Sequence, residues 1–170
     1  MPDHRIRDLD AIDLEAATSI NNANVPAVGA ADAAKLGHLL EQSSIALAVE
    51  ADGGGELAGF CIVLGPGADY GSVNYGWFAE RYDDFVYLDR VAVAEHARNA
   101  GLGSAMYAEV ERRADAPWFL LEVNLRPRND GSLRFHHRHG FAEVGQLETD
   151  YGVLVSLLAK PLSGVNDDRA

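Results

Sequence analysis

The 170-residue sequence is poor in cysteine and lysine: Cys61 is its one cysteine, and Lys35 and Lys160 are its two lysines. A lone cysteine excludes an internal disulfide and any zinc or iron–sulfur site built from several cysteines. The sequence also lacks an apolar run of the roughly 20 residues that a membrane-spanning helix needs, so we expect no membrane partner. Its first residues, MPDHRIRDLD, lack the apolar stretch of a signal peptide, and we therefore expect a cytoplasmic protein.

Positive charge is scarce as well, because 14 basic residues stand against 26 acidic ones and the formal net charge is −12. This balance argues against a nucleic-acid partner, since phosphate backbones are bound by clustered Lys and Arg. Residues 90–140 differ: eight arginines and six acidic residues give this segment a charge of +2, whereas the remainder carries −14. The planar guanidinium fork suits phosphate oxygens. The distribution predicts a phosphorylated cofactor at the central segment and a cationic substrate elsewhere, with a generic acidic surface as the alternative.

Hydrophobic periodicity and capping residues predict a mixed α/β (α+β) fold, as one domain over residues 1–160 followed by a frayed tail at 161–170. We expect helices at 10–21, with Leu9, Ile12, Ala16 and Ile20 on one face, and at 32–42, 101–114 and 130–139. Strands are expected near Ile6 and at 44–50, 56–64, 85–93, 118–123, 141–146 and 151–160, with a turn at 52–55 and a loop at 65–84. The helix between strands 85–93 and 118–123 makes these strands a parallel pair.

The segment from Val91 to Met106, VAVAEHARNAGLGSAM, ends a buried strand and places two glycines at the start of a helix. The first amides of a helix lack intrahelical partners, so this geometry favours binding of an anion. A dinucleotide-binding fingerprint is excluded because Met106 stands at its third glycine position, and a P-loop is excluded because the segment has no lysine.

The remaining spacing, Arg98-x-x-Gly101-x-Gly103 after the strand FVYLDRVAV, resembles the pyrophosphate-binding signature of the GNAT superfamily of acyl-CoA-dependent N-acyltransferases. The segment Asn129–Phe141, NDGSLRFHHRHGF, is similar to the second cofactor segment of that family. The element order over residues 4–160 also looks like the GNAT fold. The resemblance implies a mostly antiparallel central sheet with a parallel, splayed central strand pair and flanking helices.

The resemblance also implies acetyl-CoA as cofactor and assigns the residues that would bind it. Backbone groups of Val91, Ala92 and Val93 would contact the pantetheine arm. The pyrophosphate would be surrounded by Arg98, Asn99, Ala100, Gly101, Leu102, Gly103 and Ser104. Further contacts would come from Asn129, Ser132 and Phe135, although Asn129 is an equally good helix N-cap and Phe135 an ordinary core residue.

The catalytic candidates are a general acid, His136, and a general base. Many relatives have a tyrosine that protonates the CoA thiolate, and this sequence has His136 at that position. An imidazole titrates near neutral pH, so His136 is a candidate for the same role. The alternative is that His136 only contacts the cofactor. An amine acceptor must lose a proton before attack. The candidate general bases are Asp89, Glu122 and Tyr87 acting through a water, with an ion pair to Arg90 as the structural alternative for Asp89.

The loop at 65–84 combines aromatic and acidic side chains, which suit a cationic amine through cation–π contacts and ion pairing. We predict substrate contacts from Tyr70, Tyr75, Trp77 and Tyr87, with core packing or a homodimer contact as the alternatives. A metal site is not expected, because His136 and His139 share a helix face without an evident third ligand.

The resulting prediction is a cytoplasmic N-acetyltransferase that moves an acetyl group from acetyl-CoA to a small amine by direct attack in a ternary complex. The lone Cys61 lies far in sequence from the motif, so no cysteine acyl-enzyme is expected. The alternative is a catalytically silent module that binds or senses acyl-CoA, favoured by the missing tyrosine.

Overall fold

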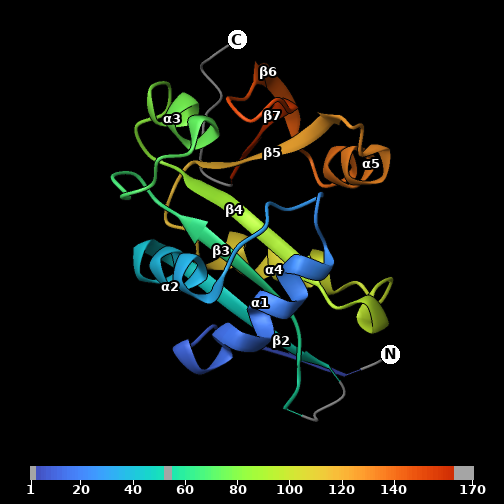
Figure 1. Cartoon of the computed structure of the whole chain (residues 1–170). Helices are drawn as coiled ribbons and strands as arrows, with labels where there is room; N and C mark the ends of the chain where they lie inside the picture. Colours follow the sequence, from blue (N-terminus) through green and yellow to red (C-terminus); the bar gives the residue numbers. More distant parts are fainter. Residues whose placement is uncertain (1–2, 52–54, 163–170) are drawn as a thin grey trace. The chain divides into compact units, whose positions relative to one another are not determined.

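The structure, a computed structural model, describes residues 3–51 and 55–162 (Figure 1). Most of the predicted turn at 52–55 and of the predicted tail at 161–170 lies outside these residues. The chain divides into two compact units, one formed by residues 1–64 and 88–114 and the other by residues 65–87 and 115–170. None of the helices in the described ranges is long and apolar enough to cross a membrane.

Seven strands form a mixed sheet in the order β1-β2-β3-β4-β5-β7-β6. All described strand pairs are antiparallel except β4 and β5, which pair in parallel with Val86 opposite Phe119 and Tyr87 opposite Leu120. The predicted mixed fold with one parallel pair is thereby confirmed. The strands are β1 His4–Asp8, β2 Ser43–Ala51, β3 Leu57–Leu64, β4 Val86–Val93, β5 Trp118–Arg126, β6 Ala142–Glu148 and β7 Leu154–Pro161.

In the first unit, helices cover both faces of β2 and β3 (Figure 1). They are α1 Leu14–Ala23, α2 Ala33–Gln42 and α4 Leu102–Arg113. Every residue of β3 is buried, as expected of a strand that packs against helices on both faces. Cys61 lies in this strand, and burial raises the pKa of its thiol to about 12.

The start of α1 differs from the sequence prediction. A 3₁₀ turn, Ala11–Asp13, precedes the helix, with Asp10 as its N-cap in a reciprocal capping box with Asp13. This tighter turn changes the phase of the helix, so that Ala17 and Ile20 are buried whereas Ile12 is 88% exposed. Of the predicted face, Leu9 and Ile20 are buried, whereas Ile12 and Ala16 are exposed, so that part of the prediction is wrong. The helix predicted at 32–42 is present as α2, and its N-cap Asp32 accepts a hydrogen bond from the Lys35 amide.

The second unit contains β5, β7 and β6, with α3 Val73–Ala79 and α5 Asp130–Arg138 on opposite faces (Figure 1). Paired residues show which side chains share a face: Glu122 is opposite Leu157, and Val123 is opposite Ser156. Gly145 of β6 is paired with Leu157 of β7. A Cβ on Gly145 would lie 2.7 Å from Cζ2 of Trp77 in α3. Helix α3 therefore covers the face that carries Glu122, and α5 covers the other face.

Helix α3 lies within the segment that we predicted as the loop 65–84. It has seven residues, and the Ser72 side chain caps it by accepting a hydrogen bond from the Tyr75 amide. The predicted end of α5 is confirmed: Gly140 follows the C-cap His139 with φ of 91°, a left-handed conformation that glycine adopts without strain.

Candidate active site

The predicted pyrophosphate segment has the backbone geometry of an anion site. Asn99 and Gly101 have positive φ angles of 63° and 77°, and Gly101 is the N-cap of the 12-residue α4. Gly101 makes no side-chain cap hydrogen bond, and the amides of a first helical turn have no partner within the helix. The positive end of the helix dipole adds to their attraction for an anion. A pyrophosphate therefore fits here by charge and by donor geometry.

Arg98 is held at this segment by a residue that the sequence analysis did not single out. Its Nη2 donates to Oδ1 of Asn24 at 3.1 Å. Nδ2 of Asn24 donates to the carbonyl oxygens of Ile20, at 2.7 Å, and of Val93, at 3.2 Å. Val93 is 69 residues from Asn24 in the sequence, and Arg98 is 74 residues from it. No local sequence pattern therefore indicates these contacts.

The end of β4 alternates between buried and partly exposed side chains. Ala92 is buried, whereas Val91 and Val93 are partly exposed. Gly59 of β3 lies so close that a Cβ there would be 3.1 Å from the Ala92 carbonyl oxygen. The backbone of β4 is thus closely packed on β3, and the Val93 carbonyl already accepts a hydrogen bond from Asn24.

Asp89, one predicted general base, forms the ion pair that we considered as its structural alternative. Its Oδ2 lies 2.9 Å from Nε of Arg90, and the two side chains are 3% and 4% exposed. Nη1 of Arg90 also donates to Oδ1 of Asn21 and to the Gly29 carbonyl. The pair therefore ties β4 to the end of α1 and to the connection that follows it, which is a structural use of the carboxylate.

Glu122, the other predicted carboxylate, is brought together with Tyr87 in the second unit. The Tyr87 hydroxyl donates to Oε2 of Glu122 at 2.7 Å, because the parallel pairing of β4 and β5 places both side chains on the face covered by α3. The Tyr87 ring is fully buried and lies 5.5 Å from the ring of Tyr75 and 5.8 Å from that of Phe78. Packing of the ring thus fixes the position of the Tyr87 hydroxyl, and the hydrogen bond from this hydroxyl orients the Glu122 carboxylate.

The predicted substrate residues of the loop have different environments. The buried Tyr75 donates its hydroxyl to the Gly65 carbonyl at 2.7 Å and accepts from the Ala68 amide at 3.0 Å, so it holds the loop together. Tyr70 is partly exposed and packs against the Tyr75 ring. Trp77 is also partly exposed and packs against Gly145. Arg81 lies 3.9 Å above the Trp77 ring. Tyr75 is therefore a structural residue of this loop, and its neighbours form the wall above the Glu122 face.

Helix α5 carries the remaining predicted residues. Oδ1 of Asn129 accepts from the Ser132 amide at 3.2 Å, so Asn129 does serve as the N-cap. The partly exposed Phe135 packs on His139, with ring centroids 4.1 Å apart. His136 is 5% exposed, and its Nδ1 lies 2.7 Å from the Ser132 carbonyl oxygen.

The protonation state of His136 follows from these contacts. A carbonyl oxygen accepts only, so Nδ1 carries the proton and Nε2 of the neutral ring has none. Burial lowers the pKa of His136 to about 4, which outweighs the raising effect of the Ser132 carbonyl. The burial that causes this shift is not visible in the sequence. At neutral pH the ring is neutral, and its Nε2 can only accept a hydrogen bond.

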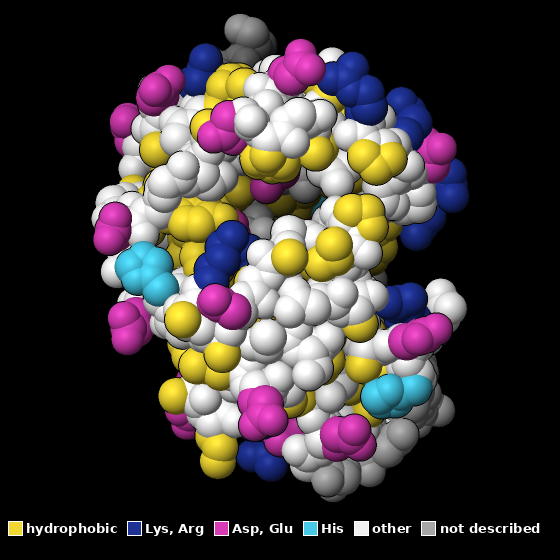
Figure 2. Space-filling view, viewed as in Figure 1, with side chains coloured by type: hydrophobic (Ala, Val, Ile, Leu, Met, Phe, Trp, Pro, Cys, Tyr) yellow, Lys and Arg dark blue, Asp and Glu magenta, His cyan; other side chains and the backbone are white. Residues whose placement is uncertain are grey.

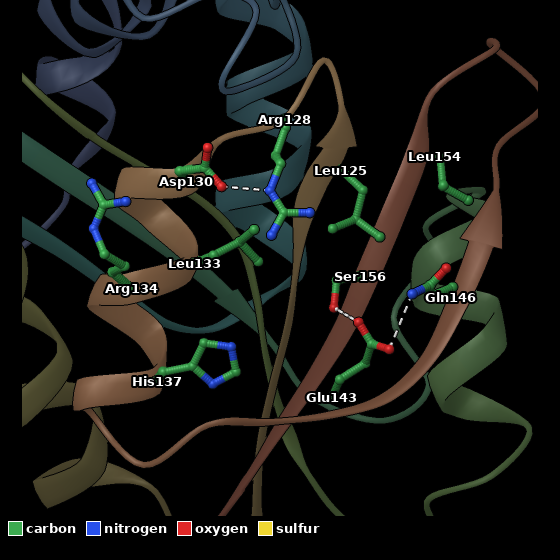
Figure 3. Close-up of a pocket in the computed structure, with 10 residues that line it drawn as sticks. All are labelled: Leu125, Arg128, Asp130, Leu133, Arg134, His137, Glu143, Gln146, Leu154 and Ser156. Carbon is green, nitrogen blue, oxygen red and sulfur yellow. Dashed lines mark hydrogen bonds and ion pairs between the residues drawn. The ribbon is translucent and has the colours of Figure 1, made fainter.

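A pocket of about 480 Å³ opens on the α5 face of the second unit (Figure 3). Its walls carry opposite charges: Arg128, paired with Asp130, lies near α5, and Glu143 lies on β6, where Ser156 and Gln146 donate to it. None of the residues predicted to bind cofactor or substrate lines this pocket. Basic side chains gather in Figure 2 on the side where α5 lies in Figure 1. Arg128, before α5, and Arg134 and Arg138 within it are exposed.

A model of the acetyltransferase (GNAT) family matches residues 13–141. The chain belongs to the GNAT family. No curated protein matches it. In the described ranges, no group of three or more His, Cys, Asp or Glu side chains is placed to hold a metal ion.

Solved structures agree with this family assignment at the level of the fold. Ard1 from Thermoplasma volcanium has a TM-score of 0.75 at 18% identity, covering 94% of this chain and 97% of that one. NAA60 from Arabidopsis thaliana, in complex with acetyl-CoA, has a TM-score of 0.74 at 18% identity, with 95% and 100% covered. The structure of yncA from Salmonella typhimurium with its cofactor acetyl-CoA has 0.69 at 20% identity, with 96% of both chains covered. The predicted GNAT-like fold is therefore confirmed.

Proposed function

We propose that this GNAT protein transfers the acetyl group of acetyl-CoA, the cofactor of the family, to the amine of a small cationic acceptor. Family membership supports the acetyltransferase activity and the cofactor. One observation supports an amine as the acceptor: the 2.7 Å hydrogen bond between Tyr87 and Glu122. It provides an oriented carboxylate, which an amine needs as its general base.

In the first unit, the α4 N-terminus would bind the pyrophosphate through its first-turn amides, with Arg98 adding positive charge. Backbone groups of Val91, Ala92 and Val93 would contact the pantetheine arm. The cofactor supplies an acetyl group activated as a thioester. The cofactor contacts proposed for the second unit, taken by itself, are Ser132, Phe135 and the N-cap Asn129.

Glu122 is proposed to take a proton from the ammonium of the acceptor, directly or through a water. The Tyr87 hydroxyl holds Oε2 in place, so the carboxylate needs no reorientation before the proton moves. Asp89 is the less suitable base, because its buried ion pair with Arg90 would have to break first.

His136 is proposed to contact the cofactor and to accept a hydrogen bond at Nε2. The lowered pKa supports this role over that of a proton donor, since a neutral ring without a proton on Nε2 has none to give in that direction. Of the two roles that the sequence left open, the contact role is the one this chemistry supports.

The proposed acceptor is cationic because acidic side chains accompany the aromatic residues of the segment 65–84: Asp69, Glu80, Asp83 and Asp84. Carboxylates and aromatic faces both attract an ammonium group.

The test is release of CoA over a panel of primary amines, with Glu122→Gln and Tyr87→Phe as variants. Loss of a general base lowers kcat by about 10²–10⁴-fold, so we expect that range for Glu122→Gln and a smaller loss for Tyr87→Phe. Glu148→Gln is the matched control, because this exposed carboxylate pairs only with Arg126.

Two results would overturn the proposal. Acetyl-CoA binding without turnover on any amine would favour the silent acyl-CoA-binding module, which the neutral His136 also allows. Turnover that Glu122→Gln leaves unchanged would remove Glu122 as the base.

A further inference from the structure

Arg98 differs from the other hydrogen-bonded arginines of the described chain in the charge of its partner. The others pair with carboxylates, so their charges are compensated: Arg7, Arg81, Arg90, Arg112, Arg113, Arg126 and Arg128. Arg98 donates to the neutral amide of Asn24. In a protein with a net charge of −12, an arginine held in place without a carboxylate keeps its charge for an external anion.

We propose that Asn24 is a positioning residue for the cofactor: it holds the Arg98 guanidinium next to the α4 N-terminus without neutralising it, so that both engage the pyrophosphate of acetyl-CoA. This inference rests on the proposed function. It assigns a role in cofactor binding to the end of α1, which contains none of the motif residues.

The hydrogen bonds of Asn24 make it a rigid holder. Nδ2 donates to the Ile20 carbonyl at the end of α1 and to the Val93 carbonyl at the end of β4, which leaves Oδ1 directed at Arg98. A long arginine side chain loses much rotamer freedom when it binds a ligand, and a side chain that is already ordered loses less. Asn24 thus lowers the entropic cost of binding while the full positive charge remains.

The amide is also suited to this position by its lack of charge. An aspartate would keep an oxygen for Arg98, but it would lose the bonds that Nδ2 donates to Ile20 and Val93 and would add a negative charge beside the pyrophosphate. Asn24→Ala and Asn24→Asp therefore test two different parts of the proposal, the position of the guanidinium and its uncompensated charge.

The experiment measures the affinity of the full-length protein for acetyl-CoA and for S-acetylpantetheine, which lacks the pyrophosphate and the nucleotide. We expect Asn24→Ala to weaken acetyl-CoA binding about tenfold, as for loss of one hydrogen bond to a charged group, and Asn24→Asp to weaken it at least as much. S-acetylpantetheine should change by less than about threefold in both. In an Arg98→Gln background, Asn24→Ala should have no further effect on acetyl-CoA binding.

The control is Asn22→Ala, which removes bonds of a neighbouring asparagine to Ala31 and none to Arg98. A wild-type protein that does not bind acetyl-CoA would refute the proposed function itself. Wild-type binding that Asn24→Ala leaves unchanged, or an equal loss for both ligands, would refute the role of Asn24 alone. If Asn24→Ala does not fold, Asn24→Asp and Arg98→Gln test the role of Asn24 instead. The quantity measured is again the affinity for acetyl-CoA relative to that for S-acetylpantetheine.

Discussion

At the scale of single residues, His136 couples the fold to pH. The imidazole of the unfolded chain binds a proton near pH 6.5, whereas burial lowers the pKa to about 4 in the folded chain. Between these values the unfolded state binds more protons, so stability should fall as the pH falls from 6.5 towards 4. The contribution of His136 to this loss is up to about 3 kcal/mol, from the two pKa values.

Urea denaturation of the wild type and of His136→Phe at several pH values measures this contribution. The free energy of unfolding of the variant should depend less on pH in this window than that of the wild type. His137→Phe, an exposed neighbour on the same helix, is the control and should follow the wild type. Parallel curves for wild type and His136→Phe would mean that the pKa of His136 is the same in the folded and unfolded states.

The contacts that define the candidate site were only partly predictable from the sequence. The cap at Asn129 and the anion geometry at Gly101 are local, so capping rules and glycine spacing indicated them. The bond between Tyr87 and Glu122 joins residues 35 positions apart and depends on the register of β4 and β5. Sequence patterns give alternation within a strand but not the register between strands, so Glu122 could not be chosen over Asp89.

At the scale of elements, helix α4 allows two glycine roles to be separated. Gly101 has φ of 77°, so Gly101→Ala should lower stability by roughly 1–2 kcal/mol. Gly103 lies within the helix, where alanine is the better helix former, so Gly103→Ala should keep or raise stability by up to about 1 kcal/mol. The added Cβ should nevertheless weaken acetyl-CoA binding, because it keeps phosphate oxygens away from the first-turn amides.

Thermal unfolding and calorimetric titration of the two variants test these opposite expectations. A folded Gly103→Ala protein with unchanged affinity for acetyl-CoA would show that the pyrophosphate does not approach this turn.

The docking of α3 on β6 gives a second prediction for an element. A Cβ on Gly145 would lie 2.7 Å from the Trp77 ring, closer than real contacts allow. Gly145→Ala should therefore destabilise the protein by about 1–3 kcal/mol, as over-packing does. The Trp77→Leu background should remove most of this effect, since the shorter side chain leaves room; equal losses in both backgrounds, measured by urea denaturation, would contradict the contact.

Element prediction failed where local signals conflict. The segment 65–84 is rich in glycine and aromatic residues, so no helical period was evident, and α3 forms because its buried side chains pack on Tyr87 and the sheet. Ile12 was expected to be buried because a continuous helix was assumed, whereas the 3₁₀ turn rotates it outwards. Tertiary packing therefore explains why α3 forms, and the capping box at Asp10 explains why Ile12 is exposed.

At the scale of the whole molecule, the net charge of −12 should influence the encounter with the acceptor. At saturating acetyl-CoA, kcat/KM for the best cationic amine should fall as salt rises, because screening shortens the Debye length to about 8 Å at physiological ionic strength. Neutralising Asp83 and Asp84 to asparagine should flatten this dependence and leave acetyl-CoA affinity unchanged. A best acceptor that is anionic, or kcat/KM independent of salt, would show that the acidic surface does not recognise the substrate.

The burial of Cys61 in β3 has a practical consequence for enzymology. A thiol with its pKa raised to about 12 and no access to solvent is inert to disulfide reagents, because only the thiolate attacks them. A thiol-specific dye added to the native protein should therefore report free CoA alone, without background from the protein. One equivalent of dye per chain should react only after the protein is unfolded, so the same reagent that follows turnover also counts the unfolded molecules.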